Sequence, residues 1–581
     1  MRLLILLLIG TLTANQALAA EKKPAPVRLQ STQSEKGTVS NDQDGTVEIN
    51  VTDVLGNDLP SRVELQEQEG VTSSAIEVPN GRAQARVSAG KYTAYVYVYA
   101  DDVPFLVDAK KIEIRKGQTE FVLTELLEGA SGGSTLFQFD KDHDLAIDSV
   151  ELACKTDPAD AASIPGRKTI PCDERVLNKE SRWYRGELNA FSEHSIGKES
   201  VEDLVKRAEK LKLDFLAITD QNTVAACYDK KWKSDSVVLL PALEWGSDER
   251  GYSLIYGPRT FVPFVDSFPQ AQALVALVQA QGGFFAAAHP CFPTSPWQWA
   301  LSYINGVEVW CREWNRVPPM SLDMLNEDMK VRDKEKKLIH SVAFAAASAT
   351  AASEPMGTSA PLLSANGQAA IFYDSELVRG LKAAAIGGSH TASPDVPMAE
   401  PVTYVFATEK SVNGILDGMR RGRTFISSGL NGPKMLFYAD ALKDGSVDVS
   451  IGGVLPVGIP VKFEVVVDDA RVGDQVQILI NGHTAISKNI EQQGTFVFRF
   501  EHTTESYAVY RARVTRGIEK DGLLSVDTVA MTSPIYAQLL DIAHPKLLEY
   551  AEKKYMEKQQ APQEINLPDP SKGEIIPQWK F

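Results

Sequence analysis

Alternating apolar and polar positions dominate two parts of the chain, residues 45–128 and 431–537. The first contains the segments VEINVTD, YTAYVYVYA and KKIEIRK, and the second contains VKFEVVVD, QVQILINGHTAI and TFVFRF. A hydrophobic period of two, interrupted by Gly, Pro or Asn-Gly turns, is typical of antiparallel strands that bury one face. We therefore predict a β-sandwich in each of these two regions.

The part between them, residues 181–430, has a different pattern. A strand at 184–189 is followed by a polar loop, an amphipathic helix that begins after Ser200, and a strand at 213–218 that is apolar after Asp214. Further strand-like runs, such as VVLLPALEWG, GFFAAAHP and AAAIGGSH, alternate with helical segments such as FPQAQALVALVQAQGG. This alternation predicts a multidomain α/β plus β protein whose central unit carries its chemistry at the carboxyl ends of parallel strands.

The remaining segments are short or polar. Residues 1–19 combine one basic residue, an apolar run and an Ala-Leu-Ala site, which predicts a signal peptide and an exported protein, periplasmic or extracellular. Residues 20–44 are expected to be a flexible lead-in, and residues 538–581 a helix followed by a disordered tail. The Ala-rich stretch 345–370 lacks periodicity and predicts a long loop or a disordered insertion.

Charge and hydropathy limit the partners. The 581 residues include 60 Lys and Arg against 76 Asp and Glu, a formal net charge of −16, and no basic block stands out. Nucleic acid and anionic lipid surfaces are therefore not expected as partners. After the first segment no run approaches the roughly 20 apolar residues that a membrane-spanning helix needs, so no membrane span is expected.

Carboxylates recur at regular intervals in the linker region, residues 129–180. The segment FDKDHDLAIDSVELACKTDP has acids at positions 1, 3, 5, 9 and 12 of an EF-hand-type loop, namely Asp140, Asp142, Asp144, Asp148 and Glu151. Ca²⁺ takes six or more oxygen ligands, which such spacing supplies, although Leu145 stands where the loop usually has glycine. We predict a structural calcium site, with a solvated acidic linker as the alternative. The stretch also resembles thrombospondin-type and dockerin-like repeats.

The chain has five cysteines, an odd number. Cys154 and Cys172 flank one loop and are candidates for a disulfide, and two unpaired thiols remain an equal alternative because sequence does not determine connectivity. Cys227, Cys291 and Cys311 lie in or beside the central strands. Those three are expected to be buried, inert thiols.

The stretch YRGELNAFSEHSIGKES, continued by DFLAITDQNT, resembles the PHP (polymerase and histidinol phosphatase) metallohydrolases, and among them the CehA/McbA-like branch. Members carry the motifs G-D-L-H-x-H-T-x-x-S-D-G and D-x-L-A-I-T-D-H-N-T. The resemblance implies a distorted (β/α)7 barrel at residues 181–430, flanked by the two sandwiches. The first sandwich is similar to carboxypeptidase-regulatory or transthyretin-like domains.

Most metal ligands of that family are replaced in this chain. Asn189 and Phe191 stand where the family has paired histidines, and Gln221 stands where it has the histidine of its second motif. The strand-end positions that retain a possible ligand are Glu244, His289, His390 and Asp220. Each lost ligand removes metal-binding energy, so we do not expect a divalent transition metal in the barrel.

Two functions therefore remain open. The first is a degenerate PHP-like barrel that acts as a non-catalytic binding or scaffolding module for a small molecule, a glycan or a protein. The aromatic residues expected at its rim are Phe191, Trp245, Tyr252, Trp310 and Trp314, with ordinary packing as the alternative. The second is a metal-dependent hydrolase of phosphoesters, carbamates or amides that uses a reduced site of Glu244, His289 and His390, supported by Asp220.

Overall fold

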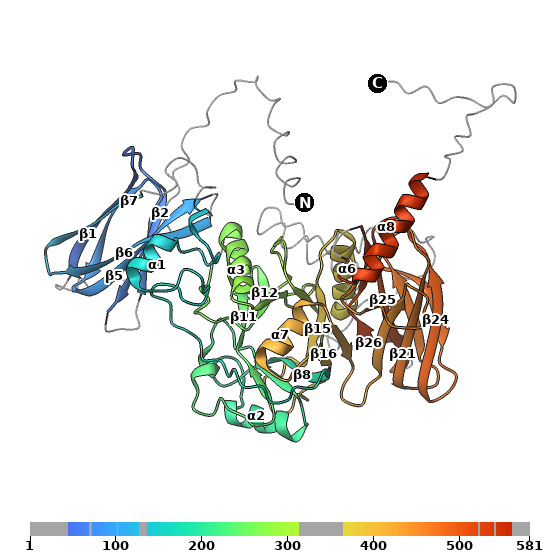
Figure 1. Cartoon of the computed structure of the whole chain (residues 1–581). Helices are drawn as coiled ribbons and strands as arrows, with labels where there is room; N and C mark the ends of the chain where they lie inside the picture. Colours follow the sequence, from blue (N-terminus) through green and yellow to red (C-terminus); the bar gives the residue numbers. More distant parts are fainter. Residues whose placement is uncertain are drawn as a thin grey trace.

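The computed structural model of the chain describes residues 44–68, 73–100, 103–126, 136, 138–265, 267–312, 364–520, 523–539 and 542–560. The predicted signal peptide, the lead-in up to residue 43, most of the Ala-rich stretch, Trp314 and the tail after residue 560 lie outside these residues. Figure 1 shows three parts in a row: N-terminal strands, a central region and C-terminal strands.

Two sheets that share one core form the N-terminal region, drawn in blue in Figure 1. One sheet has the order β4-β1-β7, with β1 at Asp44–Asp53, β4 at Arg82–Ser88 and β7 at Thr119–Leu126. The other has the order β3-β2-β5-β6, with β2 at Ser61–Glu67, β3 at Ser73–Val78, β5 at Gly90–Ala100 and β6 at Val103–Ile114. Alternate side chains, such as Val47, Ile49 and Val51, are buried in this core, as the period of two predicts. One pairing differs from the antiparallel expectation, because β1 runs parallel to β7.

Two sheets also make up the central region. The larger contains β8 (Arg182–Ala190), β9 (Phe215–Ile218), β10 (Val238–Leu240), β16 (Val402–Ala407) and β17 (Thr424–Ser427). The smaller has the order β11-β12-β13-β14-β15, with bounds Ala242–Ser247, Gly251–Tyr256, Phe284–Ala287, Gly306–Cys311 and Ala384–Gly388. Isolated bridges between Ala190 and Thr391 and between Gln221 and Glu244 join the two sheets, so their strand ends meet at one rim.

Helices pack beside these sheets. They are α2 (Val201–Lys210), α3 (Phe268–Ala280), α6 (Ala365–Val378) and α7 (Val412–Arg420), with a short 3-10 turn at Ala225–Tyr228. Of these helices, α2 and α7 are strongly amphipathic, whereas α3 and α6 are apolar on most sides. Ser200 caps α2 by accepting a hydrogen bond from the Asp203 amide, and Val201, Leu204 and Ala208 bury one face of that helix. The start of α6 corrects the expectation for the Ala-rich stretch, because residues 365–370 are helical.

The structure does not show the expected (β/α)7 barrel. β12 runs antiparallel to both of its neighbours, β11 and β13. The turn at residues 248–250 explains the first of these pairings, because three polar residues join adjacent strands as a hairpin but are too few for the crossover that parallel strands need. Among the described residues, α2, α3, α6 and α7 lie in connections between strands. No helix lies between β11 and β12 or between β13 and β14, so the strict alternation of a (β/α)7 barrel is not present there.

The C-terminal strands are continuous with the central region. β17 pairs with β26 (Leu523–Thr532), so one sheet runs on through β25 (Ala508–Lys520), β22 (Gln475–Ile480) and β23 (His483–Asn489). A second sheet has the order β19-β18-β21-β24, with bounds Val449–Ser450, Lys434–Asp440, Val461–Ala470 and Gly494–His502. The remaining elements are β20 (Val454–Pro456), β27 (Ile535–Gln538) and the helix α8 (Pro545–Gln560). One buried core contains Leu204 of α2 together with Val465 of β21, so the sandwich-like strands pack directly on the central region.

Cys154 and Cys172 are both free thiols, which is the second of the two alternatives that the sequence left open. Cys154 lies at the exposed end of α1 (Asp148–Cys154), beside the N-terminal sandwich, whereas Cys172 packs on a core cluster of the central region. The two thiols are therefore held by different parts of the molecule. Cys227 and Cys311 are buried, as predicted, and Cys291 is partly buried.

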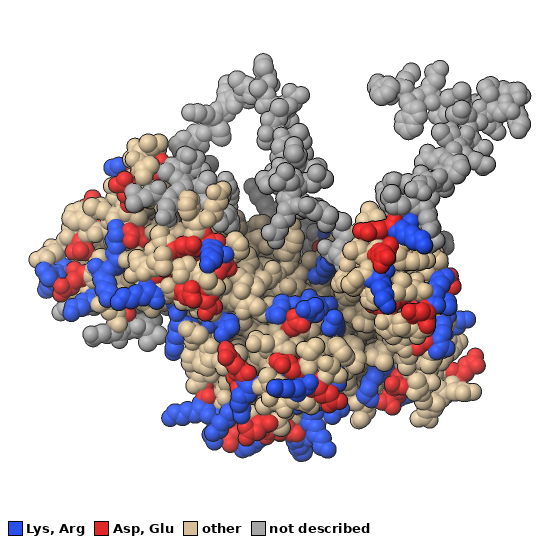
Figure 2. All heavy atoms as spheres, viewed as in Figure 1, with Lys and Arg blue, Asp and Glu red and all other residues tan. Residues whose placement is uncertain are grey.

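The surface carries both signs of charge. Figure 2 shows Lys and Arg side chains interspersed with Asp and Glu over the visible face of all three parts. Within the described part of the chain, no helix combines the length and the apolar composition that crossing a bilayer requires.

Candidate functional site

Three side chains predicted from the sequence converge at the rim where the central sheets meet. Glu244 lies in β11, His289 follows β13, and His390 follows β15. One possible ligand atom from each lies within 4.8 Å of the others. Glu244 is 1% exposed and His289 is 3% exposed, so this donor cluster is largely shielded from solvent.

The backbone is unusual at both histidines. His289 has a φ of 34° and His390 a φ of 50°, in the left-handed region that non-glycine residues seldom occupy. Such conformations concentrate at sites where the surrounding structure fixes a side chain in place. Gly388 permits this arrangement, because a Cβ there would lie 2.5 Å from the Cβ of Asn189 on β8.

The donor cluster is joined by short polar contacts. His289 Nε2 lies 3.0 Å from Glu244 Oε1, and Gln221 donates from Nε2 to Glu244 Oε2 at 2.9 Å. Burial raises the pKa of Glu244, while His390 and the Gln221 amide oppose that rise. Burial, with a smaller effect of His390, holds the pKa of His289 well below its usual value. His289 is therefore neutral near pH 7, the state in which imidazole binds metals.

A second buried carboxylate, Glu308 in β14, lies behind the donor cluster. Its Oε1 accepts a hydrogen bond from Asn189 Nδ2 at 3.1 Å, and its Oε2 accepts one from the His289 amide at 3.2 Å. Burial raises the pKa of Glu308 to about 8. Sequence reasoning missed this residue, although an acid in the middle of the apolar run GVEVWC is a signal that it has a specific partner.

Glu187 of β8 was missed as well. Its Oε1 accepts hydrogen bonds from the amides of Leu188, Asn189 and Ser389, and its Oε2 accepts from the Ser389 hydroxyl and the Ala399 amide. Burial raises the pKa of Glu187, and the donors from Ser389, Asn189 and Ala399 oppose the rise. Glu187 therefore holds the segment that carries His390 against β8.

Asp220 does not join the donor cluster. Its carboxylate accepts hydrogen bonds from the amide and hydroxyl of Ser192 at 2.7 and 2.5 Å, and from the Ser195 hydroxyl at 2.6 Å. These contacts organise the loop after β8. The expected supporting role of Asp220 beside the metal candidates is therefore replaced by a role in shaping that loop.

The aromatic residues expected at the rim are mostly core residues. Trp245 is 0% exposed, contacts Trp299 and donates its indole N–H to the Pro263 carbonyl, and Trp310 is also buried. Phe191 is buried too, and its ring contacts the His390 ring edge to face at 4.7 Å between centroids. Tyr252 is partly buried and donates to Asp248.

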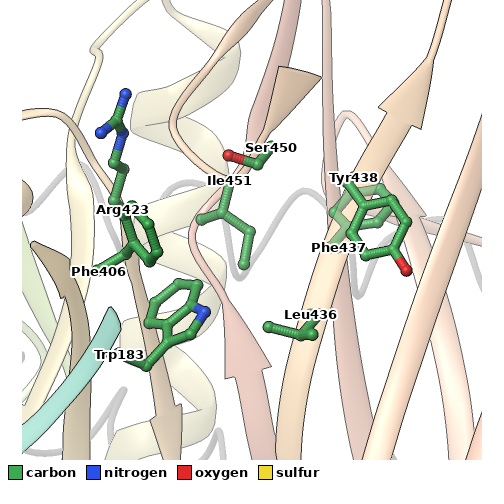
Figure 3. Close-up of a pocket in the computed structure, with 8 residues that line it drawn as sticks. All are labelled: Trp183, Phe406, Arg423, Leu436, Phe437, Tyr438, Ser450 and Ile451. Carbon is green, nitrogen blue, oxygen red and sulfur yellow. The ribbon is translucent and has the colours of Figure 1, made fainter. Parts of the chain in front are cut away.

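A cavity of about 150 Å³ lies away from the donor cluster, between the central region and the C-terminal strands. Figure 3 shows the residues that line it: Trp183, Phe406, Arg423, Leu436, Phe437, Tyr438, Ser450 and Ile451. The guanidinium of Arg423 lies 5.9 Å from the centre of the Phe406 ring. None of these residues belongs to the donor cluster.

The three donors could hold a single metal ion. Two imidazoles and a carboxylate are a common three-ligand set for a divalent ion. The further positions at which the PHP resemblance expects ligands hold Asn189, Phe191 and Gln221, and these side chains contact Glu308, His390 and Glu244 respectively. Among the described residues of the central region, Glu244, His289 and His390 form the group that could hold an ion.

Comparisons with known proteins give distant similarities. No protein-family model and no curated protein matches the chain. Among solved structures, a two-domain Bacteroides vulgatus protein containing a predicted PHP-like metal-dependent phosphoesterase aligns at 12% identity and a TM-score of 0.29, over 63% of this chain and 98% of its own. A proposed metal-dependent phosphoesterase from Bifidobacterium adolescentis aligns at 15% identity with a TM-score of 0.18. The alignment covers 26% of this chain and 82% of the other. The CARDB domain of a Pyrococcus furiosus protein aligns at 14% identity with a TM-score of 0.12. The alignment covers 19% of this chain and 97% of the other. Similarities at this level carry no conclusion about the chemistry of this chain.

Proposed function

We propose that the central region is a degenerate PHP-type domain that acts as a non-catalytic scaffold between the two strand-rich regions. The proposal rests on the contacts that side chains make at the positions where the resemblance expects metal ligands. Asn189 donates to Glu308, Gln221 donates to Glu244, and Phe191 packs on His390. Side chains that bind one another at a strand rim stabilise the fold and leave few groups to hold catalytic ions.

The scaffold role is further supported by the packing on either side. The large sheet continues from β8 through β17 into β26 and β25, and one core contains residues from both regions. Arg511 of β25 is 1% exposed at its side chain and forms a two-pronged ion pair with Asp374 of α6. The idea that aromatic side chains bind a ligand at the rim gains little support, because Trp245 and Trp310 are buried in the core. Export remains part of the proposal on sequence grounds alone.

A second candidate is a metal-dependent hydrolase with a single ion, favoured by the convergence of Glu244, His289 and His390. When bound, a divalent ion would polarise a substrate oxygen or lower the pKa of a water. Burial keeps His289 neutral and able to donate an electron pair, and Gln221 fixes the orientation of the Glu244 carboxylate. Glu308 holds the His289 backbone in position.

Metal content and turnover separate the two candidates. Full-length protein is dialysed against chelator, reloaded with Mn²⁺ or Zn²⁺, and measured for bound metal and for hydrolysis of generic phosphodiester and ester substrates. If the central region is a scaffold, we expect no hydrolysis by either protein and the same amount of bound metal in wild type and His289→Ala. The matched control is His194→Ala, which removes a partly exposed histidine of the loop after β8. One ion per chain, with turnover that is lost in His289→Ala and retained in His194→Ala, would overturn the scaffold.

A further inference from the structure

The acidic loop, residues 140–151, lies at the joint between the N-terminal sandwich and the central region. Leu106 of β6 donates its amide to the Leu145 carbonyl at 2.8 Å and accepts from the Ile147 amide at 3.1 Å, so the loop adds a short bridge to the sandwich. Ala146 and Val150 are buried in the sandwich core. The loop is therefore part of a folded unit rather than a solvated linker.

Its carboxylates converge and are buried. Oxygens of Asp140, Asp142 and Asp144 lie within 4.8 Å of one another, and Asp140 and Asp144 are each 1% exposed. Glu151, the residue at the twelfth position, is 0% exposed. Neither of its carboxylate oxygens has a hydrogen-bond partner among the described residues. A buried carboxylate in that condition is costly unless a cation compensates it.

The electrostatics agree with this geometry. Burial first, and then the neighbouring carboxylates Asp144, Asp142, Asp148 and Asp140, raise the pKa of Glu151 to about 8. Burial is also the main reason why the pKa of Asp144 rises to about 7. Glu151 is not one of the three carboxylates that lie within 4.8 Å of one another, but it lies near enough to all four aspartates that their charges raise its pKa.

No side-chain cation of the described chain neutralises the group. Among the described residues no Lys or Arg forms an ion pair with these five acids, and both oxygens of Asp142 and Glu151 and Oδ2 of Asp144 are buried without a hydrogen-bond partner. Arg167 lowers the pKa of Asp144 only as the smallest of its influences, and His143 plays the same minor part for Asp140. Within the described part of the chain, Arg167 and His143 therefore compensate the charge of the loop only weakly.

We propose that residues 140–151 bind one Ca²⁺ ion and that this ion fastens the N-terminal sandwich to the central region. Side-chain oxygens of Asp140, Asp142, Asp144 and Glu151, with the Ala146 carbonyl, supply an all-oxygen shell of the kind that Ca²⁺ takes. Asp148 fits the ninth position, which often acts through water, and it accepts a hydrogen bond from the Lys141 amide at 2.9 Å.

The backbone of the loop supports the same arrangement. Leu145, at the sixth position, has a φ of 71°, the conformation for which that position usually has glycine. Its amide donates to Asp140 Oδ2 at 2.9 Å, and the Asp144 amide donates to Asp140 Oδ1 at 3.1 Å. The absence of glycine, which counted against a calcium site in the sequence, therefore does not prevent the turn.

The chain after the loop connects directly to the central region. Ile164 and Ile170 are buried in a central core cluster, and the Ile170 amide donates to the Arg259 carbonyl at 2.8 Å. The Gln281 side chain donates to the Ala161 carbonyl at 3.0 Å. Elsewhere the sandwich meets α3 through a hydrogen bond between Gln270 and Tyr99. An ion that orders the loop therefore orders the start of the main connection between the two regions.

Calcium titration of the full chain tests the binding step. After removal of divalent ions with EGTA, CaCl2 is added to about 1 mM, the weak end of known calcium modules, and heat release and bound calcium are measured. We expect one ion per chain and a loss of affinity of at least about tenfold in Glu151→Gln, because each ligand charge tunes the affinity. The matched control is Asp444→Asn, in an exposed acidic turn without a closing glutamate. No binding by wild type, or equal binding by Glu151→Gln, would overturn the site.

The sign of the thermal shift gives a second test that does not depend on affinity. Glu151→Gln removes a buried carboxyl that without the ion must either take up a proton or stay charged, both of which cost free energy near pH 7, so in EGTA the variant should melt above wild type. In CaCl2 the order should reverse, because the variant lacks a ligand. The same order in both buffers would contradict an ion at the site.

The fastening role has its own readout. Small-angle scattering of wild type should show a larger radius of gyration in EGTA than in CaCl2, as the sandwich loosens from the central region. Identical scattering in the two buffers, with binding intact, would refute the fastening while leaving the site.

Discussion

The side-chain amide of Gln221 bonds the carboxylate of Glu244 at 2.9 Å, across the bridge that joins the two central sheets. Gln221 occupies a position where the PHP resemblance expects a metal-binding histidine, and Glu244 is one of the candidates that the chain retains. A glutamine there satisfies the buried carboxylate without any metal. In this structure the contact between Gln221 and Glu244 therefore has a structural role.

Replacement of Gln221 by alanine should destabilise the protein. The change leaves Oε2 of a buried carboxylate without its donor, at a cost of about 1–3 kcal/mol in the free energy of unfolding. Urea unfolding measures the effect. Gln492→Ala is the control, because it changes an exposed side chain in the turn before β24 and should cost less than about 0.5 kcal/mol. If both variants lowered the free energy of unfolding by the same amount, the contact between Gln221 and Glu244 would not contribute to stability as proposed.

Loss of Glu187 should be more severe. Glu187→Ala leaves the donors of Ser389, Ala399 and β8 without their shared acceptor, and removal of such a buried network costs at least about 4 kcal/mol. Chemical denaturation of the variant, beside Glu193→Ala at an exposed position of the next loop, measures the difference. A midpoint close to that of Glu193→Ala would refute the assigned role.

The ion pair between Asp374 and Arg511 should be essential for attaching the C-terminal strands. Asp374→Asn leaves a buried guanidinium without its counter-charge, which costs about 3–5 kcal/mol. Asp417→Asn breaks an exposed pair with Arg421 within α7 and should cost about 0.5 kcal/mol or less. Thermal unfolding followed by circular dichroism compares them, and similar shifts for both variants would count against a fastening role.

The cysteines should differ in reactivity. Burial raises the pKa of the Cys227 thiol to about 12, so at pH 8 this thiol stays protonated and unreactive. Cys154 is exposed and should be alkylated first in native protein. Mass spectrometry after iodoacetamide treatment reads the order, and all thiols should react in denaturant. Early modification of Cys227 would contradict its buried position.

Alternation in the sequence predicted the strands of both end regions, because a period of two follows from backbone geometry alone. The spacing of acids in residues 140–151 placed five carboxylates at ligand positions for the same local reason. The convergence of Glu244, His289 and His390 was anticipated by resemblance to a family rather than by any local pattern. Asp220 was assigned to the same group, and its bonds to Ser192 and Ser195 place it elsewhere.

The sequence by itself therefore determined the strands of the end regions and the acidic loop, both of which depend on neighbours within a few residues, while the candidate donors came from the family resemblance. Only the tertiary structure decided that β12 pairs antiparallel on both sides and that the large sheet runs into the C-terminal strands. It also revealed the partners of Glu187 and Glu308. Ala399, one partner of Glu187, lies 212 positions away from it in the sequence. Contacts over such separations arise from packing that no local pattern encodes.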